Sequence, residues 1–322
     1  MADNIEKIGN SSNMDTENQN GEDEHLWRDI DKNALDVDLI HQKITKIRDL
    51  AFLTRVETLS VRQNLVTKIE NLEPLTTLSE LDLYDNQITN IEGVDTLTNL
   101  RHLDVSFNRI GKIENLDNLN LVELYLVHNK LSTIENIGHM LNLTMLELGD
   151  NKIRKIENLS ALVHLEKLYL GKNKITQIEG LDSLKNLRVL SLQSNRILKI
   201  EGLEKLENLQ ELYLSHNGIE DITGLENNIN LSTLDLANNK IRKISNVGHL
   251  IEIEEFWFND NQIDSWDDLN ELKTMKSLDT IYLERNPIWF DATNPRQGNP
   301  MYRRKIMMYL PWVKQIDATL TH

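Results

Sequence analysis

The chain has 322 residues and a formal net charge of −16, with 51 acidic residues against 35 lysines and arginines. A surface of this charge repels nucleic acids and anionic lipids, so neither is expected as a partner, and a basic protein surface is the natural electrostatic match. The chain contains no cysteine, which excludes disulfides, thiolate metal sites and thiol nucleophiles and favours a reducing, intracellular compartment.

Residues 1–33 are predicted to form a disordered acidic N-terminal tail. The opening stretch, MADNIEKIGNSSNMDTENQNGEDEH, is polar and acidic and lacks the apolar run of a signal peptide. Such a segment cannot bury enough apolar surface to offset the entropy lost on ordering it. No run of about 20 apolar residues follows, so we expect no membrane-spanning segment.

Residues 34–286 are predicted to form a solenoid of leucine-rich repeats. The pattern LxxLxLxxN recurs every 22 residues, with one step of 21 and a last step of 25. Its asparagines are Asn64, Asn86, Asn108, Asn129, Asn151, Asn173, Asn195, Asn217, Asn239, Asn261 and Asn286. A first unit, with Gln42 at the asparagine position, brings the number of units to about twelve.

Each unit predicts a short strand, a turn at the asparagine and a return segment of about eleven residues. That return is too short for a full α-helix with its connections, so we expect 3₁₀ or extended structure on the convex side. The strands of successive units should stack into one parallel sheet on the concave side. The fold class is therefore an α/β solenoid whose leucines and isoleucines form a continuous core.

The repeated asparagine has a structural explanation. Its amide can turn into the core and bond the loop backbones of its own and neighbouring units. An apolar residue at this position would leave those backbone groups unpaired, at ~1–3 kcal/mol each.

Residues 287–322 are predicted to form a C-terminal repeat cap, partly helical, that covers the last apolar layer and the last strand edge. Its apolar residues at helical spacing are Ile306, Met307, Leu310 and Val313. In the longer unit before the cap, Ser265 and Asp268 resemble a capping box at the start of a true helix.

No constellation of catalytic, cofactor-binding or metal-ligating residues is found in the sequence. The motifs G-x-G-x-x-G, G-x-S-x-G and H-E-x-x-H are absent. Gly171–Lys172 resembles the end of a phosphate-binding loop, but Asn173 follows where a Ser or Thr would bind magnesium. We therefore predict a protein that is not an enzyme and carries no cofactor and no metal.

A stripe of lysines recurs on the return segments, at Lys46, Lys68, Lys112, Lys155, Lys199 and Lys243. Several of them lie two residues before a glutamate, so the charges alternate and largely neutralise one another. We interpret this stripe as a solvated outer face.

The concave face carries the functional signal. Side chains alternate along a strand, so the residue between the last two apolar positions of each unit points out of the sheet. These residues are Asp38, Ser60, Asp82, Asp104, Tyr125, Glu147, Tyr169, Ser191, Tyr213, Asp235, Trp257 and Tyr282. Five are acidic, five are aromatic and none is basic. The position two residues earlier adds Asp36, Glu80, Glu123, Glu211 and Glu255, opposed by Lys167.

Exposed aromatic side chains surrounded by one sign of charge are typical anchors of a protein interface. The candidate partner-binding residues are Asp82, Asp104, Tyr125, Glu147, Tyr169, Tyr213, Asp235, Glu255, Trp257 and Tyr282. The alternative, in which tall side chains merely stack along the sheet for stability, does not explain the acidic bias.

Several segments resemble the family of regulatory subunit 7 of protein phosphatase-1: returns of the type NxIxxIEGL, the unit EEFWFNDNQI, the turn YLERNP and the segment YRRKIMMYLPWVKQIDAT. The resemblance covers residues ~34–322. It implies a nuclear and cytoplasmic protein that binds the phosphatase catalytic subunit through its concave face and regulates mitotic dephosphorylation. The residues that match the family's contact positions are Asp104, Tyr125, Glu147, Tyr169, Asp235, Glu255, Trp257 and Tyr282.

Two function classes remain open. The first is a regulatory subunit of this Ser/Thr phosphatase, monomeric on its own, with room for a third regulatory protein in the complex. The second is a structural scaffold of another intracellular assembly, of the axonemal or spliceosomal type. An RNA-associated scaffold should have a basic surface, which the charge of −16 disfavours.

Overall fold

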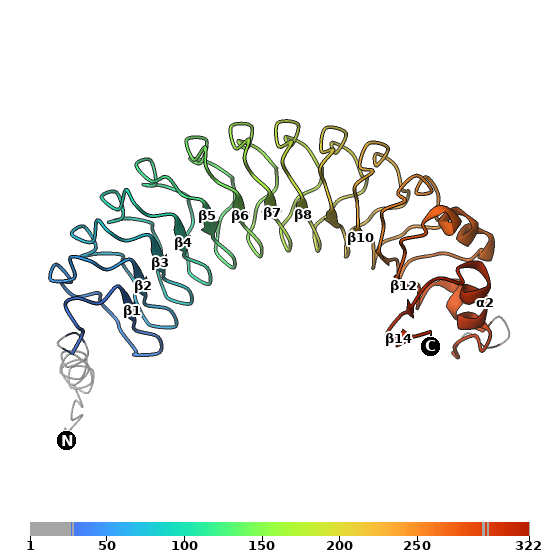
Figure 1. The fold of residues 1–322 in the computed structure, drawn as a ribbon, viewed down its shortest axis with the longest axis horizontal. Coiled ribbons are helices and arrows are strands. Elements are labelled where there is room, and N and C mark those ends of the chain that lie inside the picture. The colour runs from blue at the N-terminus through green and yellow to red at the C-terminus, as the bar shows by residue number, and fades with distance from the viewer. Residues whose placement is uncertain (1–26, 28, 292–293, 295, 322) are drawn as a thin grey trace, which may run out of the picture.

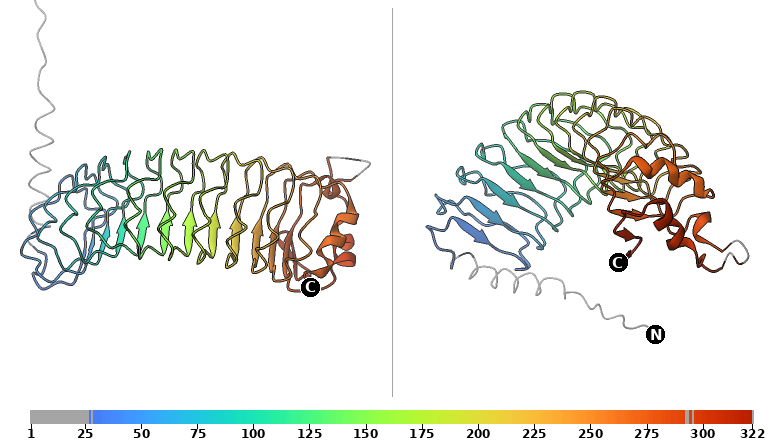
Figure 2. Two further views of the ribbon diagram at one scale, coloured as in Figure 1. Left: turned by 90° about the horizontal axis from the view of Figure 1, so that it is seen from above. Right: turned by 45° about the vertical axis from the view of Figure 1, so that its right-hand side comes forward.

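The computed structural model describes residue 27, residues 29–291, residue 294 and residues 296–321. Within these residues the chain forms an arc of stacked units, with one short strand per unit on the inner side and the return segments on the outer side (Figure 1). The strands lie side by side as a single row (Figure 2). The predicted solenoid with a parallel concave sheet is confirmed.

The sheet of the described residues follows the chain in strict order from β1 to β14. The repeat strands are β1 (Asp36–Asp38), β2 (Thr58–Ser60), β3 (Glu80–Asp82), β4 (His102–Asp104), β5 (Glu123–Tyr125), β6 (Met145–Glu147), β7 (Lys167–Tyr169), β8 (Val189–Ser191), β9 (Glu211–Tyr213), β10 (Thr233–Asp235), β11 (Glu255–Trp257) and β12 (Thr280–Tyr282). Parallel pairing places equivalent residues of neighbouring units next to each other, as for Leu59 beside Leu81. The middle residue of every strand is buried, so the leucines of the pattern form one continuous core.

The asparagine ladder has the predicted structural role. In Asn129, Nδ2 donates to the carbonyl oxygens of Val105 (3.0 Å) and Leu126 (3.2 Å). Its Oδ1 accepts from the backbone N–H of Ile110 at 2.9 Å. One side chain therefore forms hydrogen bonds with loop backbone groups of two successive units, and these groups take no part in the hydrogen bonds between strands.

The return segments consist of successive three-residue turns. In the second unit, the N–H of Leu75 donates to the carbonyl of Leu72, and the N–H of Leu78 donates to that of Leu75. The returns pass through a left-handed residue that is Asn or Gly, such as Asn71 (φ 63°) or Gly224 (φ 71°). Compact turns, and no α-helix, therefore fill the return segments of the described units.

The longer unit before the cap builds the 3₁₀ helix η1 (Trp266–Thr274). The predicted capping box on a true helix is wrong. Ser265 Oγ accepts from the N–H of Asp267 (3.2 Å), but Asp268 turns away and accepts from the N–H of Ile244 at 3.0 Å. Asp268 bonds across the units because Ile244 would otherwise leave a buried N–H unpaired.

The end of the sheet is closed by η2 (Pro287–Trp289), α2 (Tyr302–Tyr309) and the short strands β13 (Gln315–Ile316) and β14 (Thr319–Leu320). β13 pairs parallel to β12, and β14 turns back antiparallel. The carboxylate of Asp317 accepts from the N–H groups of Leu283 (2.9 Å) and Glu284 (3.0 Å), so it replaces the carbonyl that the third residue of the next strand provides in other units, as Tyr282 does for Phe258.

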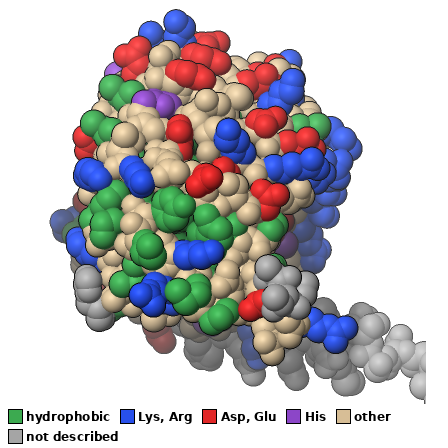
Figure 3. Space-filling model, turned by 90° about the vertical axis from the view of Figure 1, so that its right-hand side faces the viewer, with side chains coloured by type: hydrophobic (Ala, Val, Ile, Leu, Met, Phe, Trp, Pro, Cys, Tyr) green, Lys and Arg blue, Asp and Glu red, His purple; other side chains and the backbone are tan. Residues whose placement is uncertain are grey.

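Of the apolar residues predicted to close the core, Ile306, Leu310 and Val313 are buried, whereas Met307 is exposed. Figure 3 shows this end of the molecule, where hydrophobic side chains lie among lysines and arginines. Three lysines lie over aromatic rings of the neighbouring element, as Lys305 does over Trp266 at 4.6 Å. The basic groups thus cover rings on an otherwise acidic protein.

Most of the predicted tail, residues 1–33, lies outside the described residues. In its described part, Trp27 is buried and belongs to the core, with Ile30 packed against it. The first unit is therefore covered by an apolar side chain from this segment. No helix in the described part of the chain is long and apolar enough to cross a membrane.

Candidate functional site

We define the concave face as the first and third residues of β1 to β12. Each strand is three residues long with a buried middle residue, so both flanking side chains point away from the core. In-register pairing aligns these residues in two rows along the arc, as for Tyr169 beside Ser191 and Ser191 beside Tyr213. The candidate residues from Asp82 to Tyr282 thus lie on one continuous surface.

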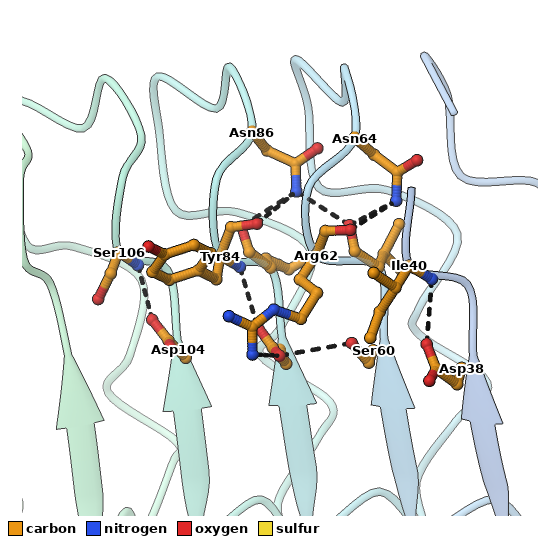
Figure 4. Close-up of polar contacts among 12 residues, drawn as sticks. Asp38, Ile40, Ser60, Arg62, Asn64, Tyr84, Asn86, Asp104 and Ser106 are labelled. Carbon is orange, nitrogen blue, oxygen red and sulfur yellow. Dashed lines mark hydrogen bonds and ion pairs between the residues drawn. The ribbon is translucent and has the colours of Figure 1, made fainter. Parts of the chain in front are cut away.

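The aspartates that occupy the third position of a strand also stabilise the local backbone. Asp104 Oδ1 accepts from the N–H of Ser106 at 2.8 Å, and Asp38 Oδ1 accepts from that of Ile40 at 3.0 Å (Figure 4). Asp82 and Asp235 bond the N–H two residues on in the same way. Each aspartate therefore closes the turn that leaves its strand. Part of the acidic bias is structural, which the sequence pattern did not indicate.

Two tyrosines share one local arrangement. Tyr125 donates its hydroxyl to Glu123 at 2.8 Å, and Tyr213 donates to Glu211 at the same distance. Burial and these carboxylates raise the pKa of both tyrosines, so they remain protonated. The bond ties each hydroxyl to the carboxylate two residues earlier on the same strand, and both tyrosines remain partly exposed on the face.

A small hollow of about 220 Å³ lies on the concave face between β3 and β5 and beside Arg62. His102 Nδ1 lies 3.2 Å from Glu123 Oε2, and Arg62 lies 3.4 Å from a carboxylate oxygen of Asp82. The Arg62 guanidinium also covers the ring of Tyr84 at 4.6 Å. Arg62 was not among the predicted site residues, because the strand pattern does not show how far a long side chain reaches. His102 was also missed, although it is the first residue of β4 and the alternation along the strand places it on the concave face.

Next to this hollow, aromatic side chains from the residues that follow the strands form a row along the edge of the concave face, which we call the rim. The ring of Tyr84 lies 4.9 Å from that of Phe107, which stacks on His128 at 4.8 Å. His128 in turn lies 2.8 Å from Asp150. The rim of these units is therefore a continuous row of stacked rings that begins at Arg62.

Trp257 and Tyr282 form the second aromatic group of the face. They are paired in register on β11 and β12, and their ring centroids are 5.7 Å apart at an interplanar angle of 60°. Glu255 precedes them on the same face of β11. The indole Nε1 of Trp257 is buried and has no hydrogen-bond partner among the described residues. The hydroxyl of Tyr282 accepts from Gln315 of the cap at 3.0 Å.

The carboxylates between these groups are partly desolvated. Burial, and secondarily the charge of Asp104, raises the pKa of Glu147. Burial also raises the pKa of Asp104 and of Asp235, against the effect of their hydrogen bonds. A cationic group brought to this face would relieve the mutual repulsion, so the arrangement favours a basic ligand.

The comparisons with known proteins agree with this architecture. A sequence profile described as Leucine Rich repeats (2 copies) matches residues 76–118, 119–161, 141–183, 163–205, 185–227 and 207–249. These overlapping matches run from residue 76 to residue 249, which is more than half of the chain. The chain belongs to the leucine-rich-repeat family.

Among solved structures, this leucine-rich-repeat chain is similar to an internalin of Listeria monocytogenes, with a TM-score of 0.69, 24% identity and coverage of 88% of this chain and 87% of that one. A leucine-rich-repeat protein of Leptospira interrogans gives a TM-score of 0.67 at 24% identity, covering 83% and 73%. At this identity the likeness shows the fold alone.

Among curated proteins, the chain is 57% identical over 57 residues to the human "Protein phosphatase 1 regulatory subunit 7". It is 56% identical over 45 residues to the "Protein phosphatase 1 regulatory subunit SDS22 homolog" of Caenorhabditis elegans. The aligned stretches cover 18% and 14% of this chain and 14% and 12% of those proteins. The similarity to the predicted family is thus shown over a limited part of each protein.

The structure separates the candidate residues into two groups. Asp82, Asp104, Tyr125, Glu147 and Tyr169 lie on β3 to β7, and Tyr213, Asp235, Glu255, Trp257 and Tyr282 lie on β9 to β12. Between the two groups, all three residues of β8 are buried, so the side chains of β8 offer little exposed surface to a partner. In the described residues no group of three or more His, Asp or Glu side chains is arranged to hold a metal ion. The surface is suited to contact with a partner at two places along the arc.

Proposed function

We propose that this leucine-rich-repeat chain is a non-catalytic regulatory subunit that binds the catalytic subunit of Ser/Thr protein phosphatase-1 through its concave face. In this proposal it regulates the activity or the location of the phosphatase during mitosis, in the nucleus and the cytoplasm. The names of the similar proteins from human and Caenorhabditis elegans support the choice of partner. The chemistry of the face supports the choice of surface.

The observation that carries the proposal is the pair Trp257 and Tyr282 with Glu255 beside it. A solenoid core of leucines does not need aromatic rings on its concave side, and these rings pack on each other rather than into the core. Trp257 and Tyr282 are both partly exposed, so a partner can pack against their rings. A rigid, partly exposed ring with a neighbouring charge has the features of an interface hot spot.

Electrostatics favour a basic partner at the same place. The protein carries a net charge of −16, and the acidic side chains of the concave face all lie on one side of the arc. Such a field speeds the encounter with a basic surface more than it stabilises the final complex. We therefore expect higher salt concentrations to lower the association rate more than they raise the dissociation rate.

The test is a binding measurement between the purified chain and the catalytic subunit of protein phosphatase-1. Truncating Trp257 to alanine should weaken binding by about 2–4 kcal/mol, or roughly 30- to 1000-fold, and Glu255→Ala should weaken it in the same direction. The melting temperature should change little, because both side chains lie outside the leucine core.

Lys155→Ala is the matched control, because Lys155 is exposed on a return segment away from the concave face. It should leave binding unchanged. If Trp257→Ala binds as well as the wild type, or if Lys155→Ala loses binding, the concave-face mechanism is wrong. The interpretation as a scaffold of another intracellular assembly would then take its place.

A further inference from the structure

In a repeat protein, each unit shows what its neighbours normally place at a given position, so a local departure can be recognised within one chain. The residue after the ladder asparagine illustrates this. In the units from Asn86 to Asn261 it is Gln, Arg or Lys in every case except Gly218. Glycine is not required there by the backbone, because its φ is not in the left-handed region.

Three further departures lie next to Gly218. In the units from Asn64 to Asn261, Leu198 is the only large apolar residue at its repeat position, which elsewhere holds residues such as Thr89 and Thr176. Asp221 occupies the position of the lysine stripe and is the only acidic residue there. Glu220 precedes it, so the unit presents two adjacent carboxylates.

These departures converge on one hollow of about 460 Å³. It is lined by the return-segment residues Leu198, Lys199, Gly218, Glu220, Asp221 and Thr223. A Cβ on Gly218 would lie 2.8 Å from Leu198 Cδ2, so the leucine side chain leans into the space that a longer residue would fill. None of the lining residues belongs to a strand, so the hollow is separate from the concave face.

The cover over the asparagine ladder is thinner at this point. The ladder residues from Asn64 to Asn173 and from Asn239 to Asn286 are buried, whereas Asn195 and Asn217 are only half-buried. Leu198 itself is 62% exposed, so its apolar side chain contributes little to the core. Packing alone therefore does not account for a leucine beside a glycine here.

The charged residues that line the hollow are two carboxylates, Glu220 and Asp221, and one lysine, Lys199, so its net charge is negative. Glu220 and Asp221 are exposed, and neither has an ion pair or hydrogen bond within the described part of the chain. Two free carboxylates repel phosphate groups, which disfavours nucleic acids and anionic membranes. An arginine or lysine can lay its apolar stem on Leu198 and still direct its charged end toward these carboxylates.

We propose that the hollow at Gly218 is a second docking site, which binds a protein segment carrying a basic residue next to an apolar one. The apolar residue and the basic stem cover Leu198, and the basic head group lies between Glu220 and Asp221. Because return segments form this site and strands form the concave face, both surfaces can be occupied at once. The proposal does not rest on binding of the phosphatase.

The test uses the whole chain with isotope-labelled leucine methyl groups and the probe peptide acetyl-Gly-Leu-Arg-Leu-Gly-amide. The peptide should shift the Leu198 methyl signals in a saturable manner below about 5 mM. Gly218→Lys restores the residue type of the neighbouring units and should weaken binding by about tenfold or more. Leu198→Thr, which restores the usual residue of its position but removes the reporting methyl groups, should weaken binding to the same extent, measured from the proton signals of the peptide. Both variants should melt like the wild type.

Lys174→Gly is the matched control, because it removes an equivalent long side chain two units away, where Arg154 replaces the leucine and Thr176 and Gln177 replace the two carboxylates. This variant should gain no second site for the peptide. The proposal is overturned if no saturable shift occurs at Leu198, if Gly218→Lys binds as tightly as the wild type, or if a peptide with Glu in place of Arg binds equally well. Capture of the phosphatase by Gly218→Lys should be unchanged, which separates the two proposals.

Discussion

Replacing Asn129 by leucine should destabilise the solenoid by an amount that can be worked out from the ladder. The N–H of Ile110 loses its acceptor and becomes an unpaired buried donor, at about 1–3 kcal/mol. The carbonyl of Val105 keeps a donor from Asn108, and that of Leu126 keeps one from Asn151. Each of these carbonyls therefore loses about 0.5–1.5 kcal/mol. The expected loss is about 2–6 kcal/mol.

The same substitution at Asn217 is the matched comparison. Its Oδ1 accepts from the N–H of Ile197 in the same geometry, at 3.0 Å, although the asparagine itself is more exposed than Asn129. Ile197 is as fully buried as Ile110, so Asn217→Leu should cost a similar amount.

Urea denaturation of the whole chain measures both costs, and hydrogen exchange at the Ile110 amide shows whether the loss is local. A much smaller cost at Asn217 would refute the argument that the burial of the bonded backbone groups sets the loss. A loss below about 1 kcal/mol for Asn129→Leu would refute the assignment of the ladder as a main source of stability.

Three further predictions concern stability. Burial raises the pKa of Asp235, so its charged form is disfavoured in the folded state. Asp235→Asn should therefore raise the melting temperature at neutral pH, and the gain should vanish as the pH falls below the usual pKa range of an aspartate carboxyl. A gain in melting temperature that persists in acid would contradict this. Gly224→Ala should lower the melting temperature, because φ is 71° and a Cβ would lie 2.5 Å from a backbone oxygen, whereas Gly111→Ala, with nothing within 4 Å, should not. Asp317→Ala should destabilise the last unit, seen as faster hydrogen exchange in β12, since two backbone N–H groups lose their acceptor; unchanged exchange there would show that the cap does not hold this strand.

The fold could be predicted because one set of physical requirements recurs in every unit. Every unit contains a leucine that must be buried, two neighbours of it that must face outward and an asparagine that must pair loop backbones. These positions recur with one period, so each unit supports the assignment of the others. The orientation of Trp257 and Tyr282 follows directly from this alternation. Their separation of 25 residues equals the last step of the repeat, so the pattern also predicts that they lie on neighbouring strands.

Features that depend on side-chain reach could not be predicted in this way. The turn-closing role of Asp104, the approach of Arg62 to Asp82 and the bond from Ile244 to Asp268 each depend on a backbone direction just beyond a strand or across two units. The repeat pattern fixes which face a residue occupies but not which neighbour a long or polar side chain will choose. The separation of the concave residues by β8 likewise depends on the sizes of neighbouring side chains.

In the single sheet each strand is bonded only to its neighbours, so the number of units determines the distance between two sites on the concave face. Neighbouring strands are ~4.8 Å apart, so eleven steps from β1 to β12 set a span of roughly 50 Å along the row. Gene duplication or loss of one unit between β7 and β9 would leave both aromatic groups chemically intact but move them one step apart or together. A partner that binds both aromatic groups at once would then no longer match their spacing or the curvature of the arc. Selection for such binding would therefore keep the number of repeats constant, even where the residues of individual repeats can change.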